Sequence, residues 1–498
     1  MTSDEFQDRR ALDVKFTGGL AWTAGAKWTT QALTWASVLA VARLLSKEDY
    51  GIGDMAGMFV NITNVLAEFG IGTAVLHMPG LDRKTLGQLH MFSMLLCTGF
   101  FGISVLLAPA VAWFFHSDHV LFFAVTASGF LLTGVQAVPL GMLQRDMDYR
   151  RLALMDALGS TAGSVMTIVG ALLGWGYWAL FAGAASGKVC ATAVLCYWKP
   201  VHFAWPRWND IRKPVEMGRH VAVSRAAASA YGMADGIVIA RTMGAGAVGT
   251  YRMAMNLASA PADKIAALIM RTATPLFANV MNDLPLARRY YLIIGEFLSL
   301  SIIPLMLGLA IVAPQAVLLL LTKQYSAAAG PLRWLGLFMI LRVLGTLAEQ
   351  VLVSQKLTRL TMRMAILNFV VMPLSFIVAA RWKGATGVAA AWIVLSPVTV
   401  FPLLWILMRS IKLPLREYAM SLIPALSGSA LMCLAVLALR TRLPAEWPLA
   451  IRLGAQVAAG GAVYIGFILC FFRQRIQRYV NFVSSLRKPK PAPEPAIS

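Results

Sequence analysis

Charged side chains interrupt two neighbouring apolar stretches near the middle of the chain. Arg225 and Asp235 lie in the first stretch, and Arg252 and Asp263 lie in the second, after a short glycine-rich turn. A charge at membrane depth is costly, so each must face a hydrated interior or a partner of opposite sign. Arg binds phosphate oxygens by charge and by paired hydrogen bonds, whereas carboxylates can carry H+ or Na+. These residue types point to an anionic cargo, with H+ or Na+ as a coupling ion.

Further polar residues recur on single helical faces in other apolar segments. We predict that the cations line a cavity and bind substrate, and that the acids serve ion coupling or pair with the cations. The predicted cationic set is Lys27, Arg225, Arg252, Arg333 and Arg342, and the acidic set is Glu68, Asp156, Asp235, Asp263 and Glu349. The alternative is that such residues form interhelical ion pairs or snorkel to a membrane surface, which suits Arg43, Arg241, Asp54 and Asp263 in particular.

The sequence predicts neither a catalytic centre nor a metal centre. The segment Gly183–Lys188 resembles a phosphate-binding loop, but it is one residue short, lacks the following Ser or Thr and lies in an apolar stretch. His116 and His119 have no third metal ligand in sight. The five cysteines lie in apolar stretches without a CxxC pair, as small core residues do. We predict a protein that is not an enzyme, holds no cofactor and relies on a gradient for any transport.

The elements that must position the charged residues are transmembrane helices. Of 498 residues, 58% are hydrophobic and 13% are charged, and a soluble protein would carry about twice that charge. The formal charge of +21 lies mainly in short loops, which indicates membrane orientation rather than nucleic-acid binding. We predict an all-α polytopic membrane protein with about fourteen spans, at 17–45, 51–77, 86–115, 119–143, 150–174, 177–198, 215–242, 247–279, 289–321, 326–354, 361–380, 385–408, 417–439 and 449–472.

Basic residues are concentrated in alternate loops between the predicted spans. The positive-inside rule then places both termini in the cytoplasm, which requires an even number of spans. We predict two pseudo-symmetric six-helix bundles followed by two extra helices. The predicted domains are a cytoplasmic N-terminal segment at 1–16, a bundle at 17–198, a cytoplasmic linker at 199–214, a bundle at 215–408, two extra spans at 409–472 and a basic, Pro-rich cytoplasmic tail at 473–498.

An offset of about 198 residues relates the two predicted bundles. It matches Ala42-Arg43 to Ala240-Arg241, Gly51 to Gly249, Asp54 to Arg252, Asn61 to Ser259 and Lys27 to Arg225. The period is far longer than that of a solenoid and is the size of a half-transporter. The matched residues include those that are hard to place in lipid, so the offset supports a duplicated membrane bundle.

Two motifs resemble those of a known family. The segment from Ala42 to Gly51, ARLLSKEDYG, resembles the ARLLxxxDYG signature of bacterial polysaccharide flippases of the Wzx/WzxC type, and Glu68–Ala74 follows as it does in that family. Asp235–Arg241, followed by Gly249–Tyr251, resembles the counterpart in the second half. These proteins belong to the multidrug/oligosaccharidyl-lipid/polysaccharide exporter superfamily. The resemblance by motif spans about the first 280 residues, and the number of spans agrees over the whole chain.

The resemblance implies a flippase that moves undecaprenyl-pyrophosphate-linked oligosaccharide repeat units from the cytoplasmic to the periplasmic leaflet for exopolysaccharide assembly. It implies alternating access through a cationic cavity, in the bacterial inner membrane, beside the polysaccharide polymerase and export machinery. Two alternatives stay open. One is a cation-coupled multidrug exporter of the same fold, whose cavity should be acidic or aromatic. The other is a membrane polysaccharide polymerase or glycosyltransferase, which usually needs a larger external loop than the 3–12 residues expected here.

Overall fold

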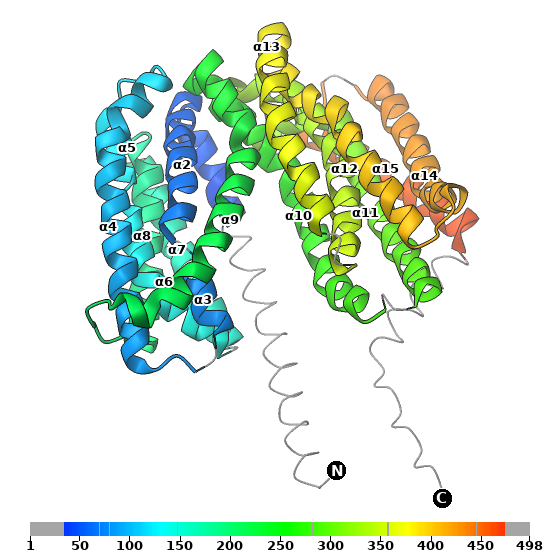
Figure 1. The fold of residues 1–498 in the computed structure, drawn as a ribbon. Coiled ribbons are helices and arrows are strands. Elements are labelled where there is room, and N and C mark those ends of the chain that lie inside the picture. The colour runs from blue at the N-terminus through cyan, green and yellow to red at the C-terminus, as the bar shows by residue number, and fades with distance from the viewer. Residues whose placement is uncertain are drawn as a thin grey trace, which may run out of the picture. The chain divides into compact units, whose positions relative to one another are not determined.

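A computed structural model describes residues 34–68, 70–78, 80–146, 148–280, 283–355, 358–444 and 446–473 (Figure 1). Helices dominate these segments, and no strand occurs in them. The predicted terminal segment at 1–16 lies outside the described residues, as does the predicted tail beyond residue 473. The all-α fold class predicted from the sequence is confirmed.

The helices follow the predicted spans closely. Residues 34–44 are helical within the first span. The next helices are α2 (Lys47–Glu68), α3 (Ile71–His77), α4 (Arg83–Phe114), α5 (Val120–Thr126), α6 (Gly129–Arg145), α7 (Tyr149–Leu172), α8 (Trp178–Trp198) and α9 (Trp208–Met243). They continue with α10 (Ala245–Val280), α11 (Leu284–Leu320), the 3-10 helix η1 (Lys323–Ala328), α12 (Ala329–Ser354), α13 (Thr358–Ser410), α14 (Leu415–Arg442) and α15 (Leu449–Phe471).

Two predicted boundaries differ from the structure. The predicted span 51–77 is broken into α2 and α3 at Gly70, which has φ 63 and would press a side chain into the backbone of Gly218. The predicted span 119–143 comprises α5 and α6, but Ala127 and Ser128 between them keep helical φ/ψ, and Val120–Arg145 is one segment long and apolar enough to cross a membrane. Helix α9 begins at Trp208, so the end of the predicted linker 199–214 is helical.

The boundary predicted between 361–380 and 385–408 is confirmed as a kink inside α13. Lys383 and Gly384 leave the helical conformation there, and Gly384 has φ 59, which favours glycine. Among the described residues, nine helical segments are long and apolar enough to cross a membrane. Helices α2, α9 and α10 are not among them. All three carry charged residues, and these include half of the predicted site residues, namely Glu68, Arg225, Asp235, Arg252 and Asp263.

Contacts divide the chain into two compact units. Unit 1 comprises residues 1–252 with 376–385, and unit 2 comprises residues 253–375 with 386–498. In unit 1, α7 and α8 approach closely because glycines face each other. A Cβ at Gly187 would lie 2.7 Å from the carbonyl oxygen of Gly159, and one at Gly163 would lie 3.0 Å from that of Gly183. Small residues spaced by four allow membrane helices to pack at backbone distance.

In unit 2, α11 is the central helix and packs against α12, α14 and α15. Arg288 Nε at the start of α11 donates to Glu417 Oε2 of α14 over 3.1 Å, and Tyr464 of α15 donates to the carbonyl of Leu300 over 2.7 Å. The two extra C-terminal helices therefore pack on this unit.

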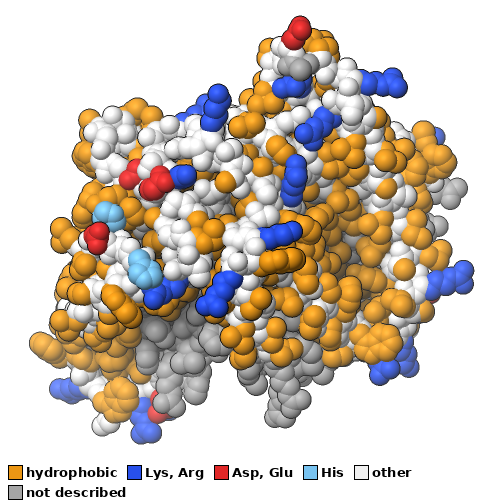
Figure 2. Space-filling model, turned by 90° about the horizontal axis from the view of Figure 1, so that it is seen from above, with side chains coloured by type: hydrophobic (Ala, Val, Ile, Leu, Met, Phe, Trp, Pro, Cys, Tyr) orange, Lys and Arg blue, Asp and Glu red, His pale blue; other side chains and the backbone are white. Residues whose placement is uncertain are grey.

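Large apolar side chains remain exposed along the helices, including Leu106, Trp382 and Phe471. Figure 2 shows a face on which hydrophobic side chains prevail and Lys and Arg side chains are scattered between them. Exposed apolar surface on this scale suits contact with lipid, because a soluble monomer rarely leaves such patches uncovered.

Candidate functional site

Helix α2 and the start of α10 cross at backbone distance in unit 1. A Cβ at Gly51 would collide with the carbonyl of Ala245, and a Cβ at Gly249 would collide with the carbonyl of Lys47. The two contacts are reciprocal, because the 198-residue offset relates Gly51 to Gly249 and Lys47 to Ala245 and so converts one contact into the other. The predicted repeat therefore corresponds to a local pseudo-two-fold arrangement at this crossing.

One turn further along both helices, Arg252 Nε donates to Asp54 Oδ2 over 2.6 Å. These two residues are also equivalent under the offset. The side chains are 16% and 31% exposed, so the pair is shielded from bulk solvent on most sides. Gly236 of α9 makes room for the guanidinium, because a Cβ there would lie 2.8 Å from Arg252 Nη2. This ion pair matches the alternative that the sequence analysis gave for Asp54. For Arg252 the sequence analysis predicted substrate binding and did not specify an ion pair.

Asp235 of α9 is fully buried beside this ion pair. Its Oδ2 accepts a hydrogen bond from the hydroxyl of Tyr251 over 2.7 Å, and its Oδ1 accepts one from the N–H of Gly236 over 2.6 Å. Asp235 interacts electrostatically with both Asp54 and Arg252. Three helices thus bring two carboxylates and one guanidinium together, an arrangement that can hold a proton or exchange a carboxylate for another anion.

Unit 2 contains a second ion pair between predicted site residues. Arg342 of α12 pairs with Asp263 of α10, and its Nη1 also lies 3.3 Å from the sulfur of Met339. Arg333 and Glu349 of α12 are exposed. As with Asp54, the pairing of Asp263 matches the alternative considered for it.

The structure gives less information on four other predicted site residues. Lys27 lies outside the described residues. The backbones of Arg225 and Glu68 are helical, in α9 and α2, but their side chains are outside the described part of the structure. Asp156 is exposed on α7. The substrate-binding and coupling roles of the predicted residues stay predictions.

Lys188 is a charged residue inside a membrane span that the predicted site did not include. It was considered only as part of a false nucleotide motif. Its ammonium donates to the hydroxyl of Thr133 on α6 over 2.5 Å, and that hydroxyl donates to Asn64 of α2 over 2.7 Å. A lysine ten residues from either end of an apolar helix is itself a signal, because charges inside membrane spans are rare and usually functional.

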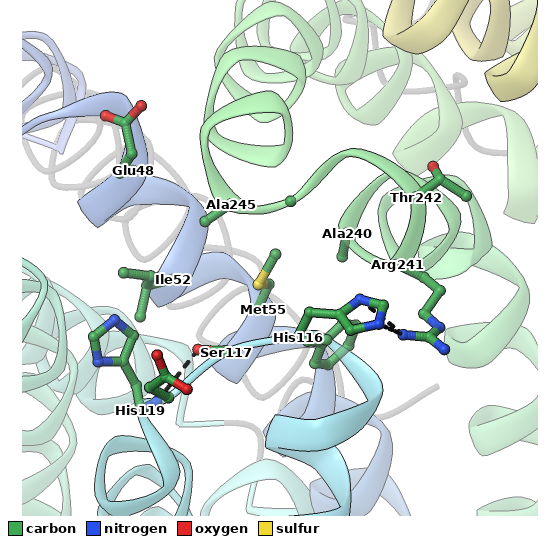
Figure 3. Close-up of a pocket in the computed structure, with 13 residues that line it drawn as sticks. Glu48, Ile52, Met55, His116, Ser117, His119, Ala240, Arg241, Thr242 and Ala245 are labelled. Carbon is green, nitrogen blue, oxygen red and sulfur yellow. Dashed lines mark hydrogen bonds between the residues drawn. The ribbon is translucent and has the colours of Figure 1, made fainter.

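A hollow of about 520 Å³ lies in unit 1, between the α4–α5 connection, the start of α2 and the end of α9 (Figure 3). Arg241 Nη1 donates to Nδ1 of His116 over 2.8 Å, and its guanidinium lies over the rings of Trp113 and Phe114. His119 also lines the hollow. Across the described residues, no three His, Cys, Asp or Glu side chains are grouped as metal ligands.

The family model described as "Polysaccharide biosynthesis protein" (Polysacc_synt_3) matches residues 40–330. The chain belongs to this polysaccharide biosynthesis protein family. The match covers Asp54, Asp235 and Arg252, and it also covers Lys188. It ends just after Ala329, the first residue of the helix that carries Arg342.

Relatives of this family member align over most of its length. The succinoglycan biosynthesis transport protein ExoT of Rhizobium meliloti (strain 1021) is 24% identical, over 96% of this chain and 97% of its own. The teichuronic acid biosynthesis protein TuaB of Bacillus subtilis (strain 168) is 23% identical, over 91% and 96%. The lipopolysaccharide biosynthesis protein WzxC of Escherichia coli (strain K12) is 20% identical, over 83% and 85%.

Solved structures establish the fold of this family member. The inward closed conformation of the lipid II flippase MurJ superposes with a TM-score of 0.74 at 16% identity, covering 92% of this chain and 100% of the other. An inward-facing multidrug resistance MATE transporter of the MOP superfamily gives a TM-score of 0.59 at 18% identity, covering 77% and 95%. The chain is a multi-pass membrane protein with the MOP-superfamily fold, as the motifs predicted.

Proposed function

We propose that this protein is a flippase that translocates undecaprenyl-pyrophosphate-linked oligosaccharide repeat units from the cytoplasmic to the periplasmic leaflet of the inner membrane. The observation that carries the proposal is the family match over residues 40–330, together with relatives aligned over nearly their whole lengths. One of these relatives is named as a transport protein of succinoglycan biosynthesis, which favours movement of a polysaccharide precursor over its synthesis.

The charges inside the helices support this proposal physically. A diphosphate and its sugars must cross about 30 Å of hydrocarbon, where even one charge costs several kcal/mol. Cations lining a hydrated passage lower that barrier, and Lys27, Arg225, Arg252, Arg333 and Arg342 are the proposed set. Alternating access would expose such a passage to each leaflet in turn.

The observed ion pairs suggest how the cargo would be held and released. Arg252 pairs with Asp54, and Arg342 pairs with Asp263. A phosphate oxygen can take the place of either carboxylate, because both are oxygen acceptors for the same guanidinium. A displaced carboxylate is then free to bind H+ or Na+. In this proposal the acids, including Asp235, couple cargo binding to an ion gradient.

The test uses a strain that lacks the gene and carries it on a plasmid. Exported polysaccharide is measured together with the leaflet position of the lipid-linked oligosaccharide, probed with a membrane-impermeant sugar-cleaving enzyme. We expect the deletion strain to retain oligosaccharide that the enzyme cannot reach, and the wild-type gene to restore access. Arg225→Ala and Arg342→Ala should abolish export at normal protein level, whereas Arg440→Ala on the exposed end of α14 should not. Full export from both site variants contradicts the cationic passage.

The same strain separates the alternatives. A multidrug exporter would restore drug resistance in a pump-deficient host and leave the oligosaccharide inaccessible. A polymerase or glycosyltransferase would incorporate radiolabelled sugar into lipid or polymer in vitro. The length and overall sequence resemble those of a xanthan repeat-unit translocase, and sugar analysis of the accumulated lipid tests that cargo and the expected partnership with a polymerase and export machinery.

A further inference from the structure

The connection between α8 and α9 packs closely against the beginning of α4 (Figure 1). A Cβ at Gly87 of α4 would lie 2.4 Å from the carbonyl oxygen of His202, so a larger residue there would displace the connection. Gln88, the next residue of α4, donates from Nε2 to Oδ2 of Asp210 over 3.1 Å. These contacts hold the 201–213 segment, which comprises most of the connection and the beginning of α9, on unit 1.

One side of the 201–213 segment is buried in unit 1. Ile211 belongs to a core cluster that also contains Leu89 of α4 and apolar residues of α3 and α6. Val201 packs against the same cluster. Because both ends of the segment are fixed by apolar contacts, the side that faces away from unit 1 is fixed as well.

The outward side of the segment carries three large aromatic side chains. Phe203, Trp205 and Trp208 are 68%, 76% and 55% exposed. They lie within six residues of one another, so they form an apolar patch that the rest of the chain does not cover. Leaving such a patch in water is unfavourable, and it marks a surface that binds a partner or a membrane.

Two cations lie beside these rings in the sequence. Arg207 and Lys213 are exposed, and neither forms an ion pair within the part of the chain that the structure describes. Arg212, by contrast, is paired with Glu216 over 2.9 Å. Guanidinium and ammonium groups bind phosphate oxygens, and Lys and Arg near a membrane surface are attracted to anionic lipids. The charge of the patch therefore favours an anionic lipid surface as its partner.

The length of α4 places the segment at the depth of lipid head groups. Helix α4 has 32 residues and is about 48 Å long, whereas the hydrocarbon core of a bilayer is about 30 Å thick. A centred, upright α4 thus extends about 9 Å beyond the hydrocarbon on each side. Gly87 and His90, which contact His202 and Phe203, lie about 6–10 Å from the start of the helix. The contact coincides with the boundary between hydrocarbon and head groups.

We propose that the 201–213 segment anchors the protein at the membrane surface by binding anionic phospholipids. The three rings lie in the interfacial layer, where tryptophan is enriched in membrane proteins, and Arg207 and Lys213 bind the lipid phosphates. The leaflet is the one that the positive-inside rule assigns to the cytoplasm. The proposal concerns the lipid of the bilayer and does not depend on the cargo, so it stands or falls separately from the proposed function.

The first test measures the depth of the segment with a bimane fluorophore. The full-length chain, with its five native cysteines replaced by alanine, carries Trp205→Cys for labelling and is reconstituted in nanodiscs of phosphatidylcholine and phosphatidylglycerol. We expect strong quenching by lipids that carry a nitroxide close to the head group and weak quenching by aqueous iodide. A label at Lys84→Cys, an exposed position at the very start of α4, should show the opposite pattern.

A second labelling position covers the case in which Trp205→Cys does not fold. Phe203→Cys keeps both tryptophans, and its label should be quenched in the same way as the label at position 205. Iodide quenching as strong as that at position 84, with no quenching by the lipid nitroxides, overturns the anchor. The aromatic patch would then be a surface for a soluble partner.

The same label measures the preference for anionic lipid. Quenching by nitroxide-labelled phosphatidylglycerol should indicate an affinity about fivefold or more above that of phosphatidylcholine, since one Lys or Arg near an anionic surface contributes about that factor. Arg207→Gln combined with Lys213→Gln should reduce the preference to within about twofold. The matched control, Arg440→Gln combined with Arg442→Gln at the exposed end of α14, removes the same net charge and should keep the preference. A preference that survives the first pair of substitutions, or that the control also removes, overturns the role of the two cations.

Discussion

Removing Arg252 should damage the protein more than removing its ion-pair partner. The guanidinium donates to Asp54 and also faces the buried carboxylate of Asp235. Arg252→Gln therefore removes the guanidinium that both carboxylates face. Asp54→Asn leaves Asp235 and the guanidinium still facing each other. The cluster predicts that the two partners of one ion pair make unequal contributions to stability.

The magnitude follows from burial. Breaking a fully buried ion pair by removing one partner costs about 3–5 kcal/mol. The Asp54 side chain is 31% exposed and Arg252 is 16% exposed, so solvent offsets part of that cost. We expect about 2–4 kcal/mol for Arg252→Gln and about 1–2 kcal/mol for Asp54→Asn. At about 2 °C per kcal/mol, Tm falls by about 4–8 °C and about 2–4 °C.

Thermal unfolding in one detergent at one scan rate measures the order of these effects. The decisive variant adds Asp235→Asn to Arg252→Gln. It removes the charge of one of the two carboxylates that face Arg252 and should recover about half of the lost Tm. Arg440→Gln, at an exposed position on α14, controls for loss of a positive charge and should leave Tm unchanged. Equal losses from the single variants, or a further loss on adding Asp235→Asn, would refute the three-membered cluster.

Three further substitutions test packing and capping. Gly249→Ala should lower Tm and abolish export, because the new methyl group collides with the backbone of Lys47; cysteine cross-linking of α2 to α10 measures the loss of the close approach. Gly183→Ala should destabilise by about 1–3 kcal/mol against crowding from α7, whereas Gly232→Ala, with open space around it, should leave Tm unchanged or raise it. Hydrogen bonds from Thr85 lower the pKa of Asp82 at the start of α4, so its stabilising effect is present above the usual carboxyl pKa of about 3.9 and is lost as pH falls below it. The Tm difference between wild type and Asp82→Ala should therefore shrink between pH 5 and pH 3.

Apolar length predicted the helices well, because a membrane-spanning segment must satisfy its backbone within one helix. The kink at Lys383 and Gly384 was also visible, as a polar interruption between two apolar runs. The break at Gly70 was not, because it depends on the close approach of Gly218 from α9, which no local pattern records. Tertiary contact decided the geometry where sequence periodicity continued without interruption.

The candidate site was also predictable from the sequence only in part. Helical stripes identified Asp235, Arg252 and Asp263 as residues that lipid would not accept, but they could not pair residues on different helices. The partner of Arg252 was nevertheless present in the offset, as Asp54. Lys188 was overlooked because it stands alone in its helix with no stripe around it. Its polar neighbours come from α2 and α6, and only the fold brings them to it.

The 198-residue offset indicates a duplication, and it also accounts for contacts between the equivalent residues of the two halves. Residues interchanged by a two-fold operation can meet each other only near its axis, and Gly51 with Gly249 and Asp54 with Arg252 do so. Identical residues at an axis would place like charges together, so a duplicated carboxylate there would repel its copy. The two halves differ at this position, with Asp in one and Arg in the other. The divergence of the repeat at position 54 converts a repulsive contact into an attractive one, and the glycines bring the helices close enough for the ion pair to form.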